Sequence, residues 1–261
     1  MADLLNNIAP WPAVDFSEFG EVSTKPLSRI QKFVASFLAR NWVAIPHVTH
    51  NDDADITSFE EQRKIFAAET GTKLTLVPFL VKVLADGLAA FPQFNTSFDP
   101  QNLALVQKKY VHIGVAVDTP GGLLVPVIRD CDRKPVTEIA AEIAALSQKA
   151  RTKGLSMAEM SGGCITLTSL GHIGGTSFTP IVNAPEVAIL GVTRARMVPQ
   201  PANDGGIMWR LTLPLSLSYD HRVINGADAA RFCRFIADKL AAPDFSLLKT
   251  EGRSIEAGQS S

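Results

Sequence analysis

The sequence predicts an α+β fold in which helices flank a mixed β-sheet, and three observations lead to it. Runs of alternating apolar and polar residues indicate strands, and the clearest covers residues 208–219. Stretches with apolar residues at helical spacing lie between these runs. In proteins with an all-parallel sheet, strands and helices alternate regularly along the chain. They do not do so here, so the sheet is expected to be mixed.

The N-terminal region is predicted to hold one helix and one strand. Apolar residues at helical spacing indicate a helix over residues 26–42. Pro46 follows and interrupts the chain, because proline is poorly tolerated inside a helix. Residues 47–56 then alternate like a strand.

Two more helices are predicted next. Thr57 and Glu60 form a capping-box pattern, which indicates a helix that begins there and ends near Glu69. Residues 75–90 are apolar nearly all round, so this second helix is expected to be buried.

The middle of the chain is predicted to be rich in strands. Residues 110–117 and 123–128 read as strands on either side of a strong turn signal at residues 118–122. Pro135 is expected in the first turn of a helix that ends near Lys153, since proline is favoured at that position.

The C-terminal half is predicted to complete the sheet. Ser156 and Glu159 cap a short helix. The remaining predicted elements are strands near residues 164–169, 187–193 and 208–219 and a helix over about residues 226–241.

Composition excludes several classes of function. The formal net charge is −1 and no block of Lys or Arg follows a helix face, so neither nucleic-acid binding nor a basic membrane surface is expected. No apolar run reaches the roughly 18 residues of a membrane span. The N-terminus lacks the pattern of a targeting segment, so a cytoplasmic location is the expectation. Cys131, Cys164 and Cys233 are widely spaced, which favours reduced thiols over a disulfide framework or a zinc site.

His221 is the strongest candidate catalytic residue. It stands where the strand over residues 208–219 gives way to the helix that opens at Asn225 and Gly226. An imidazole held at such a corner suits proton transfer near neutral pH. The alternative is structural: next to Asp220, His221 would only cap the strand end within a network of ion pairs. Asn225 has the same two interpretations, because its amide can orient the imidazole and Asn is also a preferred helix N-cap.

A second candidate lies in the strand over residues 164–169. Thr168 and Ser169 end this strand just before a glycine bend, and a hydroxyl there can donate a hydrogen bond to a developing oxyanion. The alternative is the ordinary strand preference of threonine. Cys164 is a further possible nucleophile, but no basic residue lies near it in sequence.

The other histidines give weaker signals. His47 and His50 have an HxxH spacing, but side chains at that spacing on a strand face opposite sides, and no third ligand is apparent. His112 falls in a strand, and His172 in the glycine bend. No metal site is therefore expected, and the lack of a G-x-S-x-G elbow argues against a serine hydrolase.

Several segments resemble the catalytic domain of the 2-oxo acid dehydrogenase acyltransferases, the E2 component. They occur in family order: NWVAIPHVTH, KKYVHIGVAVDTPGGLLVPVIRD, TSLGHIGGTSFTPIVNAPEVAILGV and SLSYDHRVINGADAARF. The resemblance spans about residues 14–248 and is greatest to dihydrolipoamide acetyltransferases of pyruvate dehydrogenase complexes. It implies a chloramphenicol-acetyltransferase-like fold, with an N-terminal arm or linker remnant over residues 1–14, a catalytic domain over residues 15–248 and a polar, disordered tail over residues 249–261.

The resemblance also implies a reaction and its residues. An acyl group, favoured to be acetyl, would pass between coenzyme A and a dihydrolipoyl group by direct attack of a thiolate. His221 would be the general base that takes the thiol proton, and Thr168 would donate to the oxyanion, with Ser169 as the fallback. Asn225, where the family usually has Asp, would orient the imidazole. Asp118 matches a family position near the substrate channel.

Partners are implied in the same way. The family forms trimers with the active site between subunits, and these trimers often assemble further into cubic or dodecahedral cores. A homotrimer is therefore expected here, with a larger cubic core as its extension. Coenzyme A or acetyl-CoA would be a substrate, and no cofactor would be bound covalently, because no Asp-Lys-Ala lipoylation site occurs in the chain. The lipoyl group would come from another domain or chain, and the partners would be the 2-oxo acid dehydrogenase (E1) and lipoamide dehydrogenase (E3). Two alternatives remain: a non-catalytic structural core subunit, and a stand-alone O-acetyltransferase of the chloramphenicol acetyltransferase type.

Overall fold

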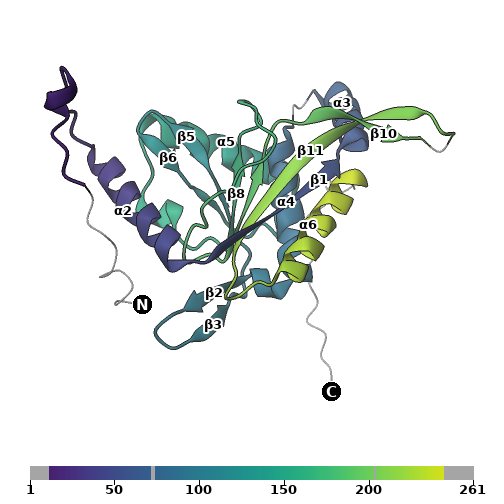
Figure 1. Ribbon diagram of the computed structural model, residues 1–261. Helices are drawn as coiled ribbons and strands as arrows, with labels where there is room; N and C mark the ends of the chain where they lie inside the picture. The colour runs from purple at the N-terminus through teal and green to yellow at the C-terminus, as the bar shows by residue number, and fades with distance from the viewer. Residues whose placement is uncertain (1–11, 72–73, 203, 244–261) are drawn as a thin grey trace.

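A seven-stranded mixed sheet forms the centre of the computed structural model, which describes residues 12–71, 74–202 and 204–243 (Figure 1). The sheet order is β1-β11-β9-β8-β4-β7, and β10 pairs with the first half of β11. Strands β4, β8 and β9 are parallel, and the other pairings are antiparallel. The predicted mixed sheet is therefore confirmed. Its strands are β1 (His47–Asp55), β4 (Ile113–Val115), β7 (Val127–Ile128), β8 (Ile165–Ser169), β9 (Ala188–Val192), β10 (Arg196–Pro201) and β11 (Ile207–Asp220).

Four of the described α-helices cover one face of this sheet. The α-helices of the described chain are α2 (Arg29–Ala44), α3 (Thr57–Thr70), α4 (Leu76–Ala90), α5 (Val136–Thr152) and α6 (Gly226–Ala241). Short 3₁₀ helices are η1 (Phe16–Phe19), η2 (Pro92–Phe94) and η3 (Met157–Met160). Helix α4 packs against both α5 and α6, and α6 packs against β1. This arrangement leaves α4 with almost no exposed side, as its apolar sequence predicts.

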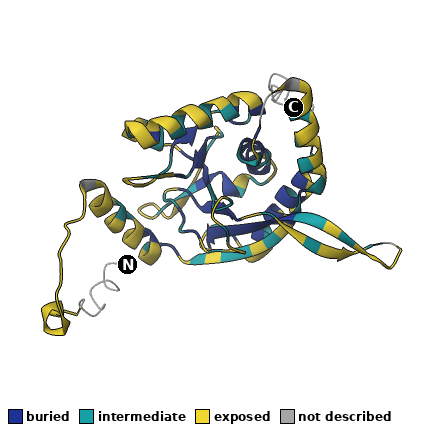
Figure 2. Cartoon of the chain, turned by 90° about the horizontal axis from the view of Figure 1, so that it is seen from above, coloured by how far each residue is buried: buried dark blue, intermediate teal, exposed yellow. Residues whose placement is uncertain are grey.

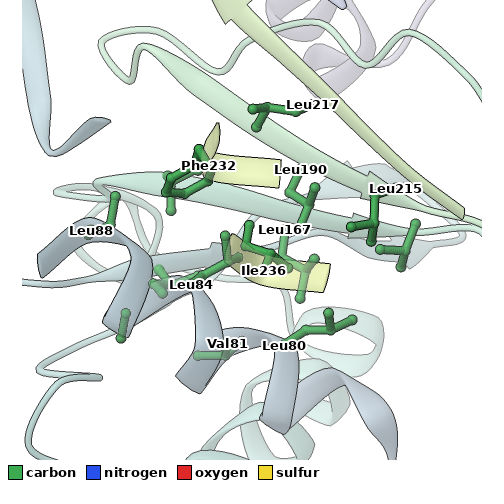
Figure 3. Close-up of a cluster of buried hydrophobic side chains, with 14 of the residues drawn as sticks. Leu80, Val81, Leu84, Leu88, Leu167, Leu190, Leu215, Leu217, Phe232 and Ile236 are labelled. Carbon is green, nitrogen blue, oxygen red and sulfur yellow. The ribbon is translucent and has the colours of Figure 1, made fainter. Parts of the chain in front are cut away.

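The main core lies between α4, α6 and the sheet (Figure 3). Leu84 of α4 and Ile236 of α6 meet Leu167, Leu190 and Leu215 of the sheet, and all five side chains are fully buried. Each such side chain contributes about 1.5–3 kcal/mol when it leaves water. The core therefore holds the central strands rigidly, including the two that carry the candidate catalytic residues.

The segment over residues 170–187 covers part of the opposite face of the sheet. The ring of Phe178 fills the space where Gly191 of β9 lacks a side chain, and the backbone N–H of Phe178 donates to the Ser216 hydroxyl at 3.4 Å. The amide of Asn41 in α2 donates to the Val182 carbonyl at 3.0 Å. These contacts attach α2 to the sheet through this segment.

Two hairpins and two outlying elements extend from the central sheet (Figure 1). The hairpins are β2–β3 (Thr96–Asp99 and Ala104–Gln107) and β5–β6 (Val117–Thr119 and Gly122–Leu124). Helix α2 and the β10–β11 ribbon reach out on different sides of the molecule, and both are largely exposed (Figure 2). The buried residues gather in the middle (Figure 2).

Several local predictions were wrong, and each has a physical reason. The capping box at Thr57 does not form: Ile56 is the N-cap, and the Thr57 hydroxyl donates to Asp55 at 2.6 Å. The predicted strand over residues 123–128 is broken at Pro126, which has no N–H for the ladder. Pro135 has an extended backbone with ψ at 157°, so it is the N-cap of α5 and lies just outside its first turn.

The structure also contains strands that the sequence pattern did not predict. The predicted strand over residues 110–117 is divided between β4 and β5, and strands β2, β3 and β10 were missed. Strand β10 contains Pro199 and Pro201, which hide its pattern and are tolerated because it is an edge strand. By contrast, the Ser156–Glu159 capping box and the helix over residues 226–241 are confirmed.

The predicted arm over residues 1–14 and tail over residues 249–261 fall mainly or wholly outside the described residues. Within the described part of the chain, no helix combines the length and apolar character that crossing a membrane requires.

Candidate active site

His221 occupies the position that the sequence predicts, directly after the last residue of β11. Its backbone N–H donates to the Pro46 carbonyl at 3.1 Å, which ties it to the residue before β1. Its ring centroid lies 5.8 Å from that of the buried Tyr219. The side chain itself is exposed. A rigid backbone thus presents an accessible imidazole, as a general base requires.

The two neighbours of His221 bind each other. The Arg222 guanidinium donates to both carboxylate oxygens of Asp220, at 2.9 Å and 2.6 Å, and the Arg222 backbone N–H donates to the same carboxylate at 3.0 Å. Asp220 is only 2% exposed, so the carboxylate of this bidentate ion pair is shielded from water, whereas the guanidinium is partly exposed.

Asn225 is the N-cap of α6, as its structural interpretation predicts. Its side-chain oxygen accepts from the Asp228 N–H at 2.9 Å, and its amide donates to the Asp228 carboxylate at 2.6 Å. Asp228 also pairs with Arg231 at 3.0 Å. A role for Asn225 in orienting His221 stays a prediction.

Thr168 and Ser169 are half-buried at the end of β8, where alternation along the strand directs their side chains to opposite faces. The Ser169 hydroxyl accepts a hydrogen bond from the Gly171 N–H at 3.3 Å, so the glycine bend orients it. Asp118 is exposed on β5, which continues from β4 beside β8. The structure therefore places Asp118, Thr168 and Ser169 toward one end of the sheet.

His221 lies toward the other end. In the sheet register, Ser169 is level with Val192, and Val192 is level with Leu215. His221 follows Leu215 by six residues, which corresponds to about 20 Å along an extended strand. Within one chain the structure thus does not bring His221 together with Thr168, Ser169 or Asp118.

A buried polar cluster went unnoticed in the sequence. The Thr166 hydroxyl donates to Glu186 at 2.6 Å, and the Asn183 amide donates to the same carboxyl at 3.3 Å. Burial raises the pKa of Glu186 to about 7, and Glu186 is only 4% exposed. Burial also lowers the pKa of the nearby Lys108. The available signal was an acidic residue inside the apolar run APEVAIL.

Two other histidines have structural contacts. His47 binds the Ile45 carbonyl through Nδ1 at 2.8 Å and accepts from the Val182 N–H through Nε2 at 2.9 Å. His112 accepts from the Asp130 N–H at 3.0 Å. A search of the described residues finds no group of three or more His, Cys, Asp or Glu side chains placed to hold a metal ion.

The cysteines do not have the character of nucleophiles. Cys131, Cys164 and Cys233 are buried free thiols. Burial raises the pKa of all three, to about 12 for Cys131 and Cys233. A buried thiol that stays protonated is inert, so the alternative of a nucleophile at Cys164 is not supported.

Residues 19–248 match the family model described as 2-oxoacid dehydrogenases acyltransferase (catalytic domain). The chain belongs to this family. It is 57% identical over 238 residues to the dihydrolipoyllysine-residue acetyltransferase component of the pyruvate dehydrogenase complex of Pseudomonas aeruginosa, covering 90% of this chain and 43% of the relative. It is 55% identical over 232 residues to the same component from Azotobacter vinelandii, covering 87% of this chain and 36% of the relative. The chain thus spans less than half the length of these relatives.

Solved structures of family members agree with this assignment. The Azotobacter vinelandii dihydrolipoamide acetyltransferase, studied for the roles of a serine, a histidine and an asparagine in its catalytic mechanism, superposes with a TM-score of 0.85 at 54% identity. That match covers 90% of this chain and 97% of the other. The cubic core of the pyruvate dehydrogenase multienzyme complex gives the same TM-score and identity over the same shares of the chains. A chloramphenicol acetyltransferase matches at 15% identity with a TM-score of 0.53, covering 78% and 94% of the two chains, and so shares the fold.

Proposed function

We propose that this chain transfers an acyl group, most simply acetyl, between coenzyme A and the dihydrolipoyl group of a lipoyl domain. The observation that carries the proposal is the exposed imidazole of His221, held at a rigid strand end in a member of this acyltransferase family. The more similar relatives are acetyltransferase components of pyruvate dehydrogenase complexes, which favours acetyl over succinyl or branched acyl groups.

In this proposal His221 takes the proton from the attacking thiol. Free thiols have a pKa of about 8.5, so a base is needed to form the thiolate at neutral pH. The thiolate sulfur then bonds to the thioester carbonyl carbon, and the tetrahedral intermediate collapses with loss of the other thiolate, which receives the proton from His221. No covalent acyl-enzyme is required.

We assign the oxyanion donor to Ser169, the neighbour of the residue that the resemblance first implied. In the Azotobacter protein the studied serine precedes the histidine by 52 residues, and the asparagine follows the histidine by four. Ser169, His221 and Asn225 have the same spacing here. The alternative donor, Thr168, precedes His221 by one residue more. Losing one oxyanion donor typically lowers the rate by about 10²–10³.

The active site would form between two copies of the chain, and we propose a homotrimer. A site shared between chains follows from the distance between His221 and Ser169 within one chain, which a second copy can bridge. The number of three copies comes from the family that the chain belongs to. Apolar side chains on the outlying elements support association: Trp42 of α2 and Ile207 and Trp209 of the ribbon are 60%, 73% and 59% exposed. A related chain forms a cubic core, so a larger assembly that binds the dehydrogenase and lipoamide dehydrogenase components is the coherent extension.

The test is transfer from acetyl-CoA to free dihydrolipoamide, with wild type beside His221→Ala. The proposal expects activity that collapses in the variant. Transfer to chloramphenicol but not to dihydrolipoamide would favour the O-acetyltransferase alternative. If wild-type oligomer fails with acetyl-, succinyl- and branched acyl-CoA alike, the non-catalytic core subunit becomes the better interpretation.

A further inference from the structure

We infer that Arg222 is a positioning residue for His221, and that Phe98 of the β2–β3 hairpin holds Arg222 in place. This inference rests on the proposed function, because it concerns the same imidazole. Arg222 does not need to touch a substrate in this role. It acts through the backbone on both sides of His221.

The geometry of residues 220–222 links Arg222 to the backbone of His221. The side chain of Arg222 reaches back over one intervening residue and grips the Asp220 carboxylate with two N–H groups, while its own backbone N–H binds the same carboxylate. These bonds close rings that include the backbone of His221. Together with the bond from the His221 N–H to Pro46, they restrain the backbone of His221 on both sides.

A distant part of the chain supports Arg222. The centre of its guanidinium lies 4.4 Å from the centroid of the Phe98 ring, a cation–π contact. Phe98 is half-buried in β2, whereas Arg222 keeps 27% of its side chain exposed. The hairpin therefore covers one side of the guanidinium and limits the ways in which it can turn.

Arginine can make contacts at this position that lysine cannot. A planar guanidinium can bind a carboxylate with two parallel bonds and stack on an aromatic ring at the same time. A lysine ammonium keeps the positive charge but cannot form the two parallel hydrogen bonds to one carboxylate. If the role of residue 222 is to fix geometry, Arg222→Lys should therefore recover only part of the function.

A pocket beside Arg222 allows a chemical test. It has a volume of about 440 Å³ and is lined by Phe98, Asp220, Arg222 and, from α2, Phe37 and Arg40. Removal of the Arg222 side chain would join its space to this open pocket. Methylguanidinium then has a route to the vacated position, where it can bind Asp220 and stack on Phe98.

The experiment compares Arg222→Ala, Arg222→Lys and Phe98→Leu in the full chain, using acetyl transfer to dihydrolipoamide. For Arg222→Ala we expect kcat to fall by about 10²-fold, the usual effect of misplacing a catalytic group by an ångström, with little change in KM for acetyl-CoA. Methylguanidinium should restore part of this kcat. Arg222→Lys and Phe98→Leu should show smaller losses, again in kcat.

Arg234→Ala is the matched control. Arg234 also binds aspartates, Asp52 and Asp238, each at 3.1 Å, but it lies on α6 without a bond to the 220–222 turn. Equal losses in Arg234→Ala and Arg222→Ala would overturn the inference, as would a kcat that methylguanidinium leaves unchanged. If Arg222→Ala does not fold, Phe98→Leu decides: an unchanged kcat in that variant contradicts the inference.

A second measurement separates this inference from the proposed function. The imidazole carbon signal of His221 in labelled protein is assigned by its disappearance in His221→Gln. Arg222→Ala should shift or broaden this signal, and Arg234→Ala should not. An inactive wild type with this spectral pattern would reject the proposed function and keep the positioning role, whereas an unmoved signal would reject the positioning role alone.

Discussion

Ser169 and His221 lie at opposite ends of one β-sheet, about 20 Å apart along the strand direction. The parallel pairing of β8 with β9 and the antiparallel pairing of β9 with β11 produce this separation. Ser169 is the last residue of β8 and lies at one end of the strands. Strand β11 runs in the opposite direction, so His221, which follows it, lies at the other end. One chain therefore cannot place both side chains on the same substrate carbonyl.

Complementation between inactive variants should follow from this separation. His221→Ala and Ser169→Ala are each expected to be nearly inactive. When the two variants are unfolded and refolded together, mixed oligomers will contain sites with an intact histidine from one chain and an intact serine from another. A random mixture should regain roughly a quarter of wild-type activity, because only that share of sites has both residues.

The control for complementation is a mixture of the two variants assembled separately and combined without unfolding. It should remain inactive while the oligomers do not exchange chains. Failure of the refolded mixture to exceed either parent would indicate a site within one chain.

Ser169→Ala and Thr168→Val should differ in kcat. The proposal assigns the oxyanion bond to Ser169, so Ser169→Ala should lower kcat by about 10²–10³. Thr168→Val removes a hydroxyl but preserves shape and strand preference, so a change of only a few-fold is expected. Steady-state kinetics of both variants will check this, and the reverse order would return the role to Thr168.

Two substitutions of Asn225 should separate its roles as helix cap and as orienting group. Asn225→Ala removes the cap and should lower the free energy of unfolding by about 1 kcal/mol. Asn225→Ser retains a capping oxygen, so its stability should stay near that of wild type. If the Asn225 amide also orients His221, both variants will lose kcat to a similar extent. Denaturant unfolding and kinetics on the same samples give the two readings, and a full kcat in Asn225→Ser would leave the cap as the role of this residue.

Glu186 should make folding stability depend on pH. Burial raises its pKa from the ordinary 4.5 to about 7, so between these values the folded chain holds the proton more tightly than the unfolded chain does. The free energy of unfolding should therefore fall as the pH rises through this window. Glu186→Gln should flatten that part of the profile, and Glu61→Gln, at an exposed position on α3, should not. Urea unfolding at several pH values is the measurement, and parallel profiles for Glu186→Gln and wild type would contradict the prediction.

Phe232 should be one of the costlier core residues to truncate. It is fully buried, and its ring stacks on that of Phe94 with centroids 4.0 Å apart. Phe232→Ala should lower the free energy of unfolding by about 3–5 kcal/mol. Phe235, on the same helix, is only half-buried, so Phe235→Ala should have a smaller effect. Both are compared at one protein concentration, because association contributes to the stability of an oligomer.

Local periodicity accounts for the elements that the sequence alone predicted. Leu213, Leu215, Leu217 and Tyr219 alternate in β11 with proline and serine residues, and this alternation predicts the strand although both of its faces are buried. Periodicity failed where prolines obscure or interrupt it: β10 pairs with β11 despite two prolines, and Pro126 divides a run that otherwise reads as one strand.

A strand pattern and a helix cap adjoin in the sequence, and this is enough to place a histidine at the corner between β11 and α6. What surrounds that corner depends on how distant segments fold together. Two contacts join residues that are far apart in the chain: Phe98 stacks on Arg222, and Glu186 is buried beside Thr166. The separation of Ser169 from His221 likewise results from how distant strands pair. Such contacts depend on sheet order and strand direction, which no local pattern encodes.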